Sequence, residues 1–304
     1  MTTKGIYHTL VTQLDKLARH NRQGSFRTKD RYYEAVKRFC AYLAAHYHLQ
    51  KLENISGKHL VSYVLYLQAQ AKSASTIKSD LSAIRFFHDK MSNPRYMLPG
   101  NEELGVVLER RRFGQQDRTW TNSEFGKLIG RAMAEEREDY ILALYLARYA
   151  GLRIHKCFRM DTAAAERALR ENVLTVKGKG GKVRIVPIED DRITMMLQRL
   201  LEKTERGHKL LVPDGVPTDR AINGMQQFIL HHRDAICDPT APDRRITFHG
   251  LRHTYAAEKY TALVNGGMMP LDAHFTVSRL LGHKRPDVTD IYLASVKGGA
   301  ARGE

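Results

Sequence analysis

The feature that most constrains the fold of this chain is a single change in the spacing of its apolar residues. Over most of the sequence, apolar side chains recur every three or four positions, which is the period of an amphipathic helix. Two β-rich runs, Val173–Val176 and Val183–Ile188, break that period, and the Lys- and Gly-rich segment between them predicts a hairpin. We therefore expect a mainly α fold with a small β-sheet.

The predicted helices fall into two groups, and the 304 residues suffice for two domains with cores of their own. Residues 1–92 have helical spacing throughout and predict a helical N-terminal domain. Prolines and glycines then interrupt the pattern, and the basic polar run ERRRFGQQDR follows. We expect a basic linker over residues 93–119 and a second, α+β domain over residues 120–304.

The charge of the chain indicates a polyanionic partner. The formal net charge is +16 at pH 7, and the basic excess is spread over both predicted domains. A basic protein without a nucleic-acid role is an alternative that charge alone disfavours only mildly, and a solvated face is an equal alternative for basic residues on predicted helices. The candidate DNA contacts are Lys78, Arg85, Lys90, Arg110, Arg111, Arg112, Lys177 and Lys182.

Cysteine usage and hydropathy indicate a reducing compartment. Cys40, Cys157 and Cys237 are odd in number and form no CxxC pair, so neither a disulfide framework nor a zinc ribbon is indicated. No apolar run has the length of a signal peptide or a membrane span. We expect a cytoplasmic protein with no membrane partner.

Six polar residues stand at positions that the apolar pattern does not explain. They are a poor metal set, because arginine does not ligate metals and HxxRH differs from the HExxH of zinc helices. They are a good phosphate set, because guanidinium groups bind phosphate oxygens bidentately and lysine adds a point charge. A nearby tyrosine could form a covalent phosphotyrosine without a metal or a nucleotide. Each of the six residues taken alone has a plain structural explanation, but their joint occurrence does not. The six are Arg153, Lys179, His249, Arg252, His283 and Tyr292.

The same residues lie in five motifs that occur in a fixed order. The motifs are GLR, GKGGKVRIVPI, HGLRH, LLGH and the tyrosine of DIYLA. In these motifs the chain resembles the tyrosine recombinase (phage integrase) family over its whole C-terminal half, and SASTIKSDLSAIRFF resembles that family's core-binding domain. The resemblance implies a SAM-like core-binding domain over residues 1–92 and a catalytic domain over 120–304, with a C-terminal nucleophile and a short tail.

The resemblance also implies a role for each residue. Tyr292 would attack the scissile phosphate and form a 3′-phosphotyrosyl link, with His249 accepting the tyrosine proton. Lys179 would protonate the leaving 5′-oxygen as the general acid. Arg153 and Arg252 would hold the non-bridging oxygens. No cofactor or metal is expected.

Three features near these motifs bear on how closely the chain follows the family pattern. His283 occupies the place where the family has histidine or tryptophan, and the resemblance implies that it hydrogen-bonds the phosphate. Lys156 stands three residues after Arg153, where the family usually has an acidic residue, so we expect weakened activity. The stretch from Arg252 to His283 is long for the family, and we expect an extra loop at NGGMMPLDAHF, residues 265–275.

The function implied is a site-specific recombinase or integrase. It would cut and rejoin double-stranded DNA at a short inverted-repeat core site, as a homotetramer, through a Holliday junction, and would be associated with the nucleoid. Few residues precede the first predicted core-binding helix, which leaves little room for a separate arm-binding domain and favours a simple recombinase or a transposon integrase that acts on short inverted repeats. The alternatives are DNA relaxation like that of a type IB topoisomerase, or a DNA-binding module with impaired catalysis, which Lys156 makes less remote.

Overall fold

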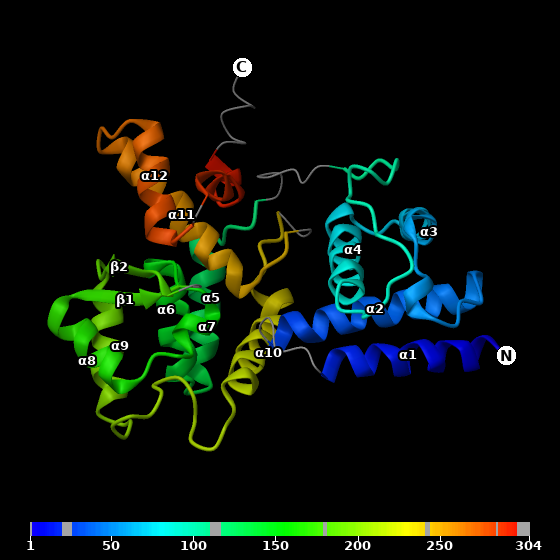
Figure 1. Cartoon of the computed structure of the whole chain (residues 1–304). Helices are drawn as coiled ribbons and strands as arrows, with labels where there is room; N and C mark the ends of the chain where they lie inside the picture. Colours follow the sequence, from blue (N-terminus) through cyan, green and yellow to red (C-terminus); the bar gives the residue numbers. More distant parts are fainter. Residues whose placement is uncertain are drawn as a thin grey trace. The chain divides into compact units, whose positions relative to one another are not determined.

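The computed structural model divides into two compact units, residues 1–111 and 112–304, which are described separately (Figure 1). The residues that it describes are 2–19, 26–109, 117–178, 181–240, 244–283 and 285–296.

The first unit is a helical bundle built around α2. Its elements are α1 (Thr3–Arg19), α2 (Phe26–His46), the 3-10 turn η1 (Leu52–Asn54), α3 (Gly57–Ala69) and α4 (Ala74–His88). Ile6, Leu10 and Leu14 recur every fourth residue on α1, so one stripe of that helix is buried against α2. The other long neighbour of α2 is α4, and Phe39 and Tyr63 lie in the common core (Figure 1).

The segment after α4 returns to the first unit instead of leaving it. Leu104 is buried, and Leu98 and Leu108 pack against the same apolar core. Arg85 on α4 donates hydrogen bonds to the Pro99 carbonyl and to Asn101. The described part of the predicted linker, residues 93–109, is therefore a packed segment of the first unit.

The second unit is built around a helix that is buried on nearly every side. This helix, α6 (Glu138–Ala150), packs against four other described helices of the unit. A helix that is apolar on all sides is stable in water only when other elements cover all its sides, and the neighbours of α6 do so. The helices around it are α5 (Asn122–Ala134), α7 (Ile154–Cys157), α8 (Thr162–Glu171), α9 (Asp191–Leu201), α10 (Thr218–Ile236), α11 (Phe248–Asn265) and α12 (Pro270–Leu281), followed by the 3-10 turn η3 (Pro286–Ile291).

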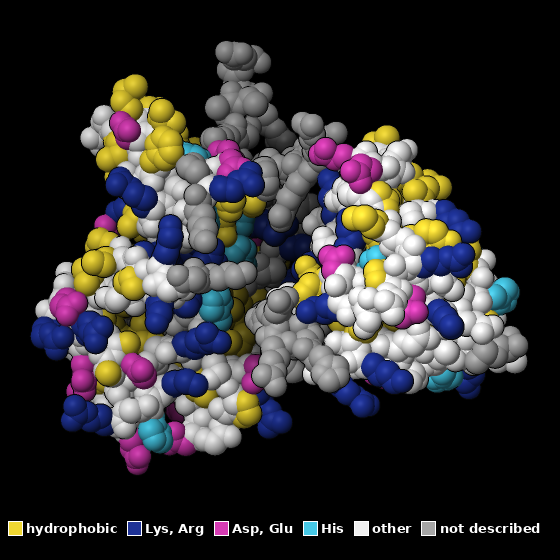
Figure 2. Space-filling model, viewed as in Figure 1, with side chains coloured by type: hydrophobic (Ala, Val, Ile, Leu, Met, Phe, Trp, Pro, Cys, Tyr) yellow, Lys and Arg dark blue, Asp and Glu magenta, His cyan; other side chains and the backbone are white. Residues whose placement is uncertain are grey.

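The predicted hairpin is confirmed. Strand β1 (Val173–Lys177) pairs antiparallel with β2 (Val183–Pro187), and the pair is the two-stranded sheet of the described residues. Leu174 and Val176 of β1 and Val186 of β2 are buried, whereas Thr175 and Ile185, which alternate with them, are exposed. The expected fold class, mainly α with a small β-sheet, is thereby confirmed. Figure 2 shows Lys and Arg side chains gathered on the face of this unit near the hairpin.

The loop that we expected at residues 265–275 is wrong. Helix α11 ends at Asn265, a turn with Gly267 at φ 90° follows, and α12 begins at Pro270. Proline fits the first turn of a helix, where its missing N–H is not needed, so Pro270 begins α12 within the segment expected to be a loop. The long spacing between Arg252 and His283 is filled by α12.

The described residues contain neither a candidate membrane span nor a candidate metal cluster. No helix among them is long and apolar enough to cross a membrane. Within the same ranges, no three His, Cys, Asp or Glu side chains are grouped closely enough to hold a metal ion.

Candidate active site

Tyr292 lies among three histidine rings at the C-terminal end of η3. Its hydroxyl is 3.2 Å from Nε2 of His249, which is hydrogen-bond distance. The ring of His253 stacks on the tyrosine with 4.4 Å between centroids, and the ring of His283 lies at 4.9 Å. The tyrosine ring is therefore held between imidazoles, and its hydroxyl faces a nitrogen that can accept a proton.

Arg252 is fully buried beneath this tyrosine and joins two helix ends. Its Nη1 donates to the carbonyl of Gly151 at the end of α6, and its Nη2 donates to the carbonyl of Leu281 at 2.5 Å. The guanidinium carbon is 5.5 Å from the centroid of the Tyr292 ring. Burial, and then the nearby Arg153, lower the pKa of Arg252 to about 9. The group stays cationic at neutral pH, and its Nε has no hydrogen-bond partner among the described residues.

His283 follows α12 through a turn at Gly282, which has φ 68° and therefore favours glycine. Its Nδ1 is 2.8 Å from Oγ1 of the buried Thr289, and its Nε2 is 3.4 Å from Nη2 of Arg252. Because a guanidinium can only donate, Nε2 is the accepting nitrogen and Nδ1 carries the hydrogen. Burial, and then Arg252 and Arg153, lower the pKa of His283 to about 3. This imidazole is neutral at physiological pH.

His249 occupies the first turn of α11, which begins after the N-cap Thr247. Burial among the surrounding residues, and then the charges of Arg252 and Arg153, lower the pKa of His249 to about 4. The residue nevertheless keeps an exposed edge. A neutral imidazole that touches both Tyr292 and solvent can accept a proton and pass it on.

Arg153 provides a guanidinium that is not engaged by the described protein. It is the N-cap residue of α7, two residues after the left-handed Gly151, and its side chain is half-buried. No hydrogen-bond partner for that side chain exists among the described residues, yet it lies close enough to lower the pKa of His249, Arg252 and His283. An anion is the ligand that such a group can accept.

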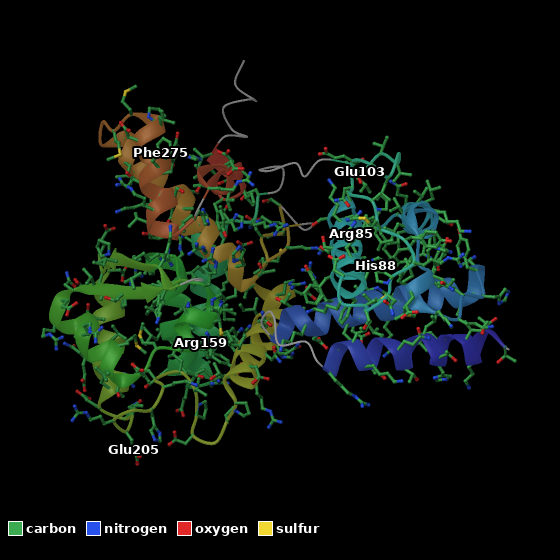
Figure 3. The ribbon with its side chains drawn as sticks, in the orientation of Figure 1. Arg85, His88, Glu103, Arg159, Glu205 and Phe275 are labelled. Carbon is green, nitrogen blue, oxygen red and sulfur yellow. The ribbon has the colours of Figure 1, made fainter. Side chains whose placement is uncertain are left out.

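Lys156 lies in the same cationic cluster. Burial lowers its pKa, and the strongest neighbouring charges are Arg159, Arg153 and Arg184, all of the same sign. Figure 3 labels Arg159 beside α7. Lys156 therefore places a second positive charge near Arg153, as expected, and the strongest charges around Lys156 are basic.

Five of the six predicted catalytic residues are brought together by contacts or by electrostatic proximity. Around Arg252 lie Arg153, His249, His283 and Tyr292. Lys179 lies outside the described residues. Its hairpin is closed on either side of that position by a hydrogen bond of 2.6 Å from the Gly178 amide to the Lys182 carbonyl. Lys177 and Lys182 are exposed at the end of the hairpin.

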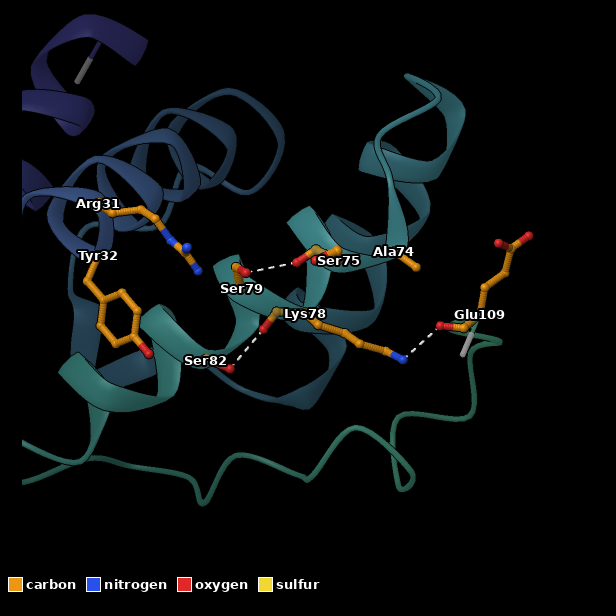
Figure 4. A pocket seen from close by; sticks show the side chains of 8 residues that line it. All are labelled: Arg31, Tyr32, Ala74, Ser75, Lys78, Ser79, Ser82 and Glu109. Carbon is orange, nitrogen blue, oxygen red and sulfur yellow. Dashed lines mark hydrogen bonds between the residues drawn. The ribbon is translucent and has the colours of Figure 1, made fainter. Parts of the chain in front are cut away.

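The predicted DNA contacts of the first unit differ in their surroundings. Lys78 lines a pocket together with Arg31 of α2, and its Nζ donates to the Glu109 carbonyl at 2.8 Å (Figure 4). Lys90 lies 4.8 Å from the centroid of the Phe86 ring. Arg85, labelled in Figure 3, is occupied by the segment described above, and burial lowers its pKa. Arg110, Arg111 and Arg112 lie outside the described residues.

Two basic residues of these sites were missed by the sequence reasoning. Arg31 is far from Lys78 in sequence, and no local pattern pairs them. Arg184 on β2 donates to the carbonyl of Leu280, and burial, then Arg153, lower its pKa to about 10. A signal for Arg184 was available, because alternation along a strand puts it on the same side as the buried Val186.

Comparisons with known proteins agree with this arrangement. The chain matches the Phage integrase family over residues 121–298 and the Phage integrase, N-terminal SAM-like domain over residues 12–91. It is 31% identical to y4rC of Sinorhizobium fredii, named as an integrase/recombinase, over 40% of this chain and only 34% of that relative. It is 24% identical to the tyrosine recombinase XerS of Streptococcus sanguinis, over 80% of this chain and 77% of the relative.

Solved structures share the fold at low identity. The Tn1549 transposon integrase in complex with transposon right-end DNA has a TM-score of 0.59 at 15% identity, covering 100% of this chain and 99% of its own. The XerH site-specific recombinase bound to a palindromic difH substrate has a TM-score of 0.62 at 17% identity, covering 96% and 83%. A lambda integrase dimer bound to a COC′ core site has 0.61 at 16%, covering 93% and 76%. With its N-terminal SAM-like domain and its C-terminal site around a tyrosine, the chain belongs to the phage integrase family of tyrosine recombinases.

Proposed function

We propose that this chain is a site-specific DNA recombinase that cuts and rejoins DNA through Tyr292. The observation that carries the proposal is the Tyr292 hydroxyl, which lies 3.2 Å from a neutral His249. Arg252 lies against the tyrosine ring, and Arg153 is close enough to lower the pKa of both His249 and Arg252. That combination provides a nucleophile, a proton acceptor and a binding site for phosphate oxygens. The relatives are recombinases and integrases, which gives no support to the topoisomerase alternative.

The proposed reaction needs no external energy source. The Tyr292 oxygen attacks phosphorus while its proton passes to His249, the P–O5′ bond breaks, and Lys179 protonates the departing 5′-oxygen. Arg153 and Arg252 stabilise the charge on the non-bridging oxygens. The 5′-hydroxyl of a second strand then attacks the 3′-phosphotyrosyl bond and releases the tyrosine.

The proposed partner is double-stranded DNA with short inverted repeats. Three of the similar structures are described as complexes with a transposon end, a difH substrate and a core site. We propose that four copies of this chain assemble on two such sites and exchange strands through a Holliday junction at the nucleoid. The transposon integrase among the similar structures supports a mobile-element role.

Lys156 leads us to propose a weakened enzyme. Where a carboxylate could hold the guanidinium of Arg153, an ammonium has no acceptor atom and adds repulsion. The cationic surroundings of Lys156 support this proposal.

The test starts from DNA that the chain itself selects from a pool of random duplexes. A selected site is placed twice in a supercoiled plasmid, and products are separated on denaturing gels with and without proteinase. We expect a covalent protein–DNA complex and recombinant circles with the natural chain. With Tyr292→Phe, which keeps the ring and loses the hydroxyl, we expect binding without a covalent complex. Relaxation of plasmids that lack the site would favour topoisomerase activity, and an adduct with the phenylalanine variant would refute the nucleophile.

A further inference from the structure

Two arginines from different elements hold neighbouring carbonyls at the C-terminal end of α12. Arg184 of β2 donates to the carbonyl of Leu280, and Arg252 of α11 donates to the carbonyl of Leu281. The last carbonyls of a helix have no partners within the helix, and its C-terminal end attracts cations. Two guanidinium groups therefore satisfy acceptors at the point where the chain turns towards His283.

We propose that Arg184 is a positioning residue for the reaction at Tyr292, fixing the end of α12 from which His283 and the tyrosine segment continue. This inference rests on the proposed function. We assign Arg184 a contact with the Leu280 carbonyl and no contact with DNA, and the DNA affinity of its variants tests this assignment.

The turn after α12 is built over the Arg184 side chain. A Cβ atom at Gly282 would lie 3.0 Å from Cδ of Arg184, which is tighter than ordinary packing, and the backbone there has φ 68°. The absence of a side chain at Gly282 thus allows the arginine to reach the carbonyl beneath the turn. The turn is fixed by a side chain from β2 as well as by its own backbone bonds.

A continuous series of contacts leads from this turn to the nucleophile. The amide of His283 donates to the Ser278 carbonyl at 3.0 Å, and its Nδ1 donates to Thr289 Oγ1 at 2.8 Å. The amide of Tyr292 then donates to the carbonyl of the same Thr289 at 2.9 Å. A shift at the end of α12 would therefore move the His283 ring, and with it the residue that holds the tyrosine backbone.

The position of Arg184 on β2 also joins the hairpin to this segment. In the register of the hairpin Arg184 lies opposite Val176, two residues after Lys182. The strand that follows Lys179 in the sequence thus holds the end of α12 through one side chain. Loss of Arg184 should disturb the positions of His283 and Tyr292, while the candidate DNA contacts Lys177 and Lys182 keep their charges.

The experiment compares Arg184→Met and Arg184→Lys with Arg192→Met in the full chain. Arg192 belongs to the same unit, pairs with Asp190 and lies over the ring of Tyr149, so its loss controls for removal of an ordered arginine. The first measurement is amide hydrogen exchange without DNA. We expect the amides of Gly282 and His283 to exchange at least about 10-fold faster in Arg184→Met but not in Arg192→Met, with a smaller change in Arg184→Lys.

The second measurement is strand cleavage of a selected site with an ordinary phosphodiester and with a 5′-phosphorothiolate, whose sulfur leaves without protonation. We expect Arg184→Met to cleave both about 10–100-fold more slowly, by analogy with lost partners of metal ligands. DNA affinity should stay unchanged, and Arg184→Lys should recover part of the rate. Lys179→Ala is the contrasting variant, because the sulfur substrate should restore its cleavage.

Each result that differs from these expectations would contradict a specific part of the proposal. Unchanged exchange at Gly282 and His283 would overturn the proposal, as would faster exchange with normal cleavage, which would make the contact structural only. Rescue of Arg184→Met by the sulfur substrate would place its action at the leaving group, and weaker DNA binding would indicate a direct phosphate contact; both contradict positioning. Absence of cleavage by the natural chain would refute the proposed function, whereas the exchange result would still decide whether Arg184 holds α12.

Discussion

At the scale of single residues, Lys156 provides the most direct test of how charge limits this site. We predict that Lys156→Glu cleaves DNA about 10-fold faster than the natural chain, because a carboxylate can hold Arg153 and relieves the repulsion among Arg153, Arg159 and Arg184. Lys156→Gln removes the charge without supplying a carboxylate and should give an intermediate rate. Cleavage rates in single turnover and DNA affinities are measured for all three chains. Unchanged cleavage with weaker binding would mean that Lys156 contacts a DNA phosphate instead.

The buried histidine of the site predicts how stability depends on pH. Burial, and then His249, lower the pKa of His253 to about 3, and its side chain is 1% exposed. The unfolded chain, with a histidine pKa of about 6.5, binds a proton that the folded chain does not, so this contribution is present above pH 6.5 and is lost as pH falls towards 3. The free energy of unfolding should fall by about 1.4 kcal/mol per pH unit for this residue in that window.

Urea unfolding between pH 6.5 and 4 measures this slope, and His253→Phe is the matched variant, because it keeps a ring against Tyr292. The variant should have a shallower slope by about one proton. Equal slopes for the two chains would show that His253 is not kept neutral by the fold.

At the scale of elements, the start of α11 is shaped by the chain that passes beside it. A Cβ atom at Gly250 would lie 2.5 Å from the Arg118 carbonyl oxygen and 2.7 Å from Nε1 of Trp120. We predict that Gly250→Ala lowers the free energy of unfolding by about 1–3 kcal/mol through overpacking and slows cleavage by displacing His249. Gly126→Ala is the control, because nothing lies within 4 Å of its added Cβ. That variant should be neutral or more stable by about 0.5–1 kcal/mol, since alanine favours the helix. Equal melting shifts for both variants would contradict the close approach.

The elements also show what the sequence could and could not predict. The hairpin followed from alternation and glycine placement, and helical periodicity identified the mainly α fold, because both patterns are local. Helix α12 was mistaken in part for a loop because the long spacing between Arg252 and His283 was attributed to an extra loop. The partners of Arg184 and Arg252 are carbonyls at the end of α12, and carbonyls carry no residue identity. Motif order could select Arg252 but could not reveal what its side chain holds.

At the scale of the whole molecule, basic charge on both units predicts a strong dependence of DNA binding on salt. The logarithm of affinity should fall linearly with the logarithm of salt concentration, with a slope set by the number of phosphates neutralised. Lys78→Gln should reduce that slope by about 1, because the Lys78 ammonium lies near Arg31 and donates to one carbonyl, which leaves it further donors for a phosphate. Arg85→Gln should leave it unchanged, because Arg85 is bound to Pro99 and Asn101. Fluorescence titrations between low and physiological salt decide this, and a flat dependence for the natural chain would exclude binding dominated by phosphates.

Arg153 and Arg252 should be lost by mutation at different rates in related chains that have lost their catalytic activity. Arg252 closes the ends of α6 and α12, so its removal would strand two buried carbonyls, and selection for a folded protein alone would retain it. Arg153 has no such duty among the described residues, so only a chain that still handles a phosphate has reason to keep it. A degenerate copy of this gene should therefore lose Arg153 first. Among degenerate copies, the arginine of GLR, rather than that of HGLRH, therefore indicates recent catalytic activity.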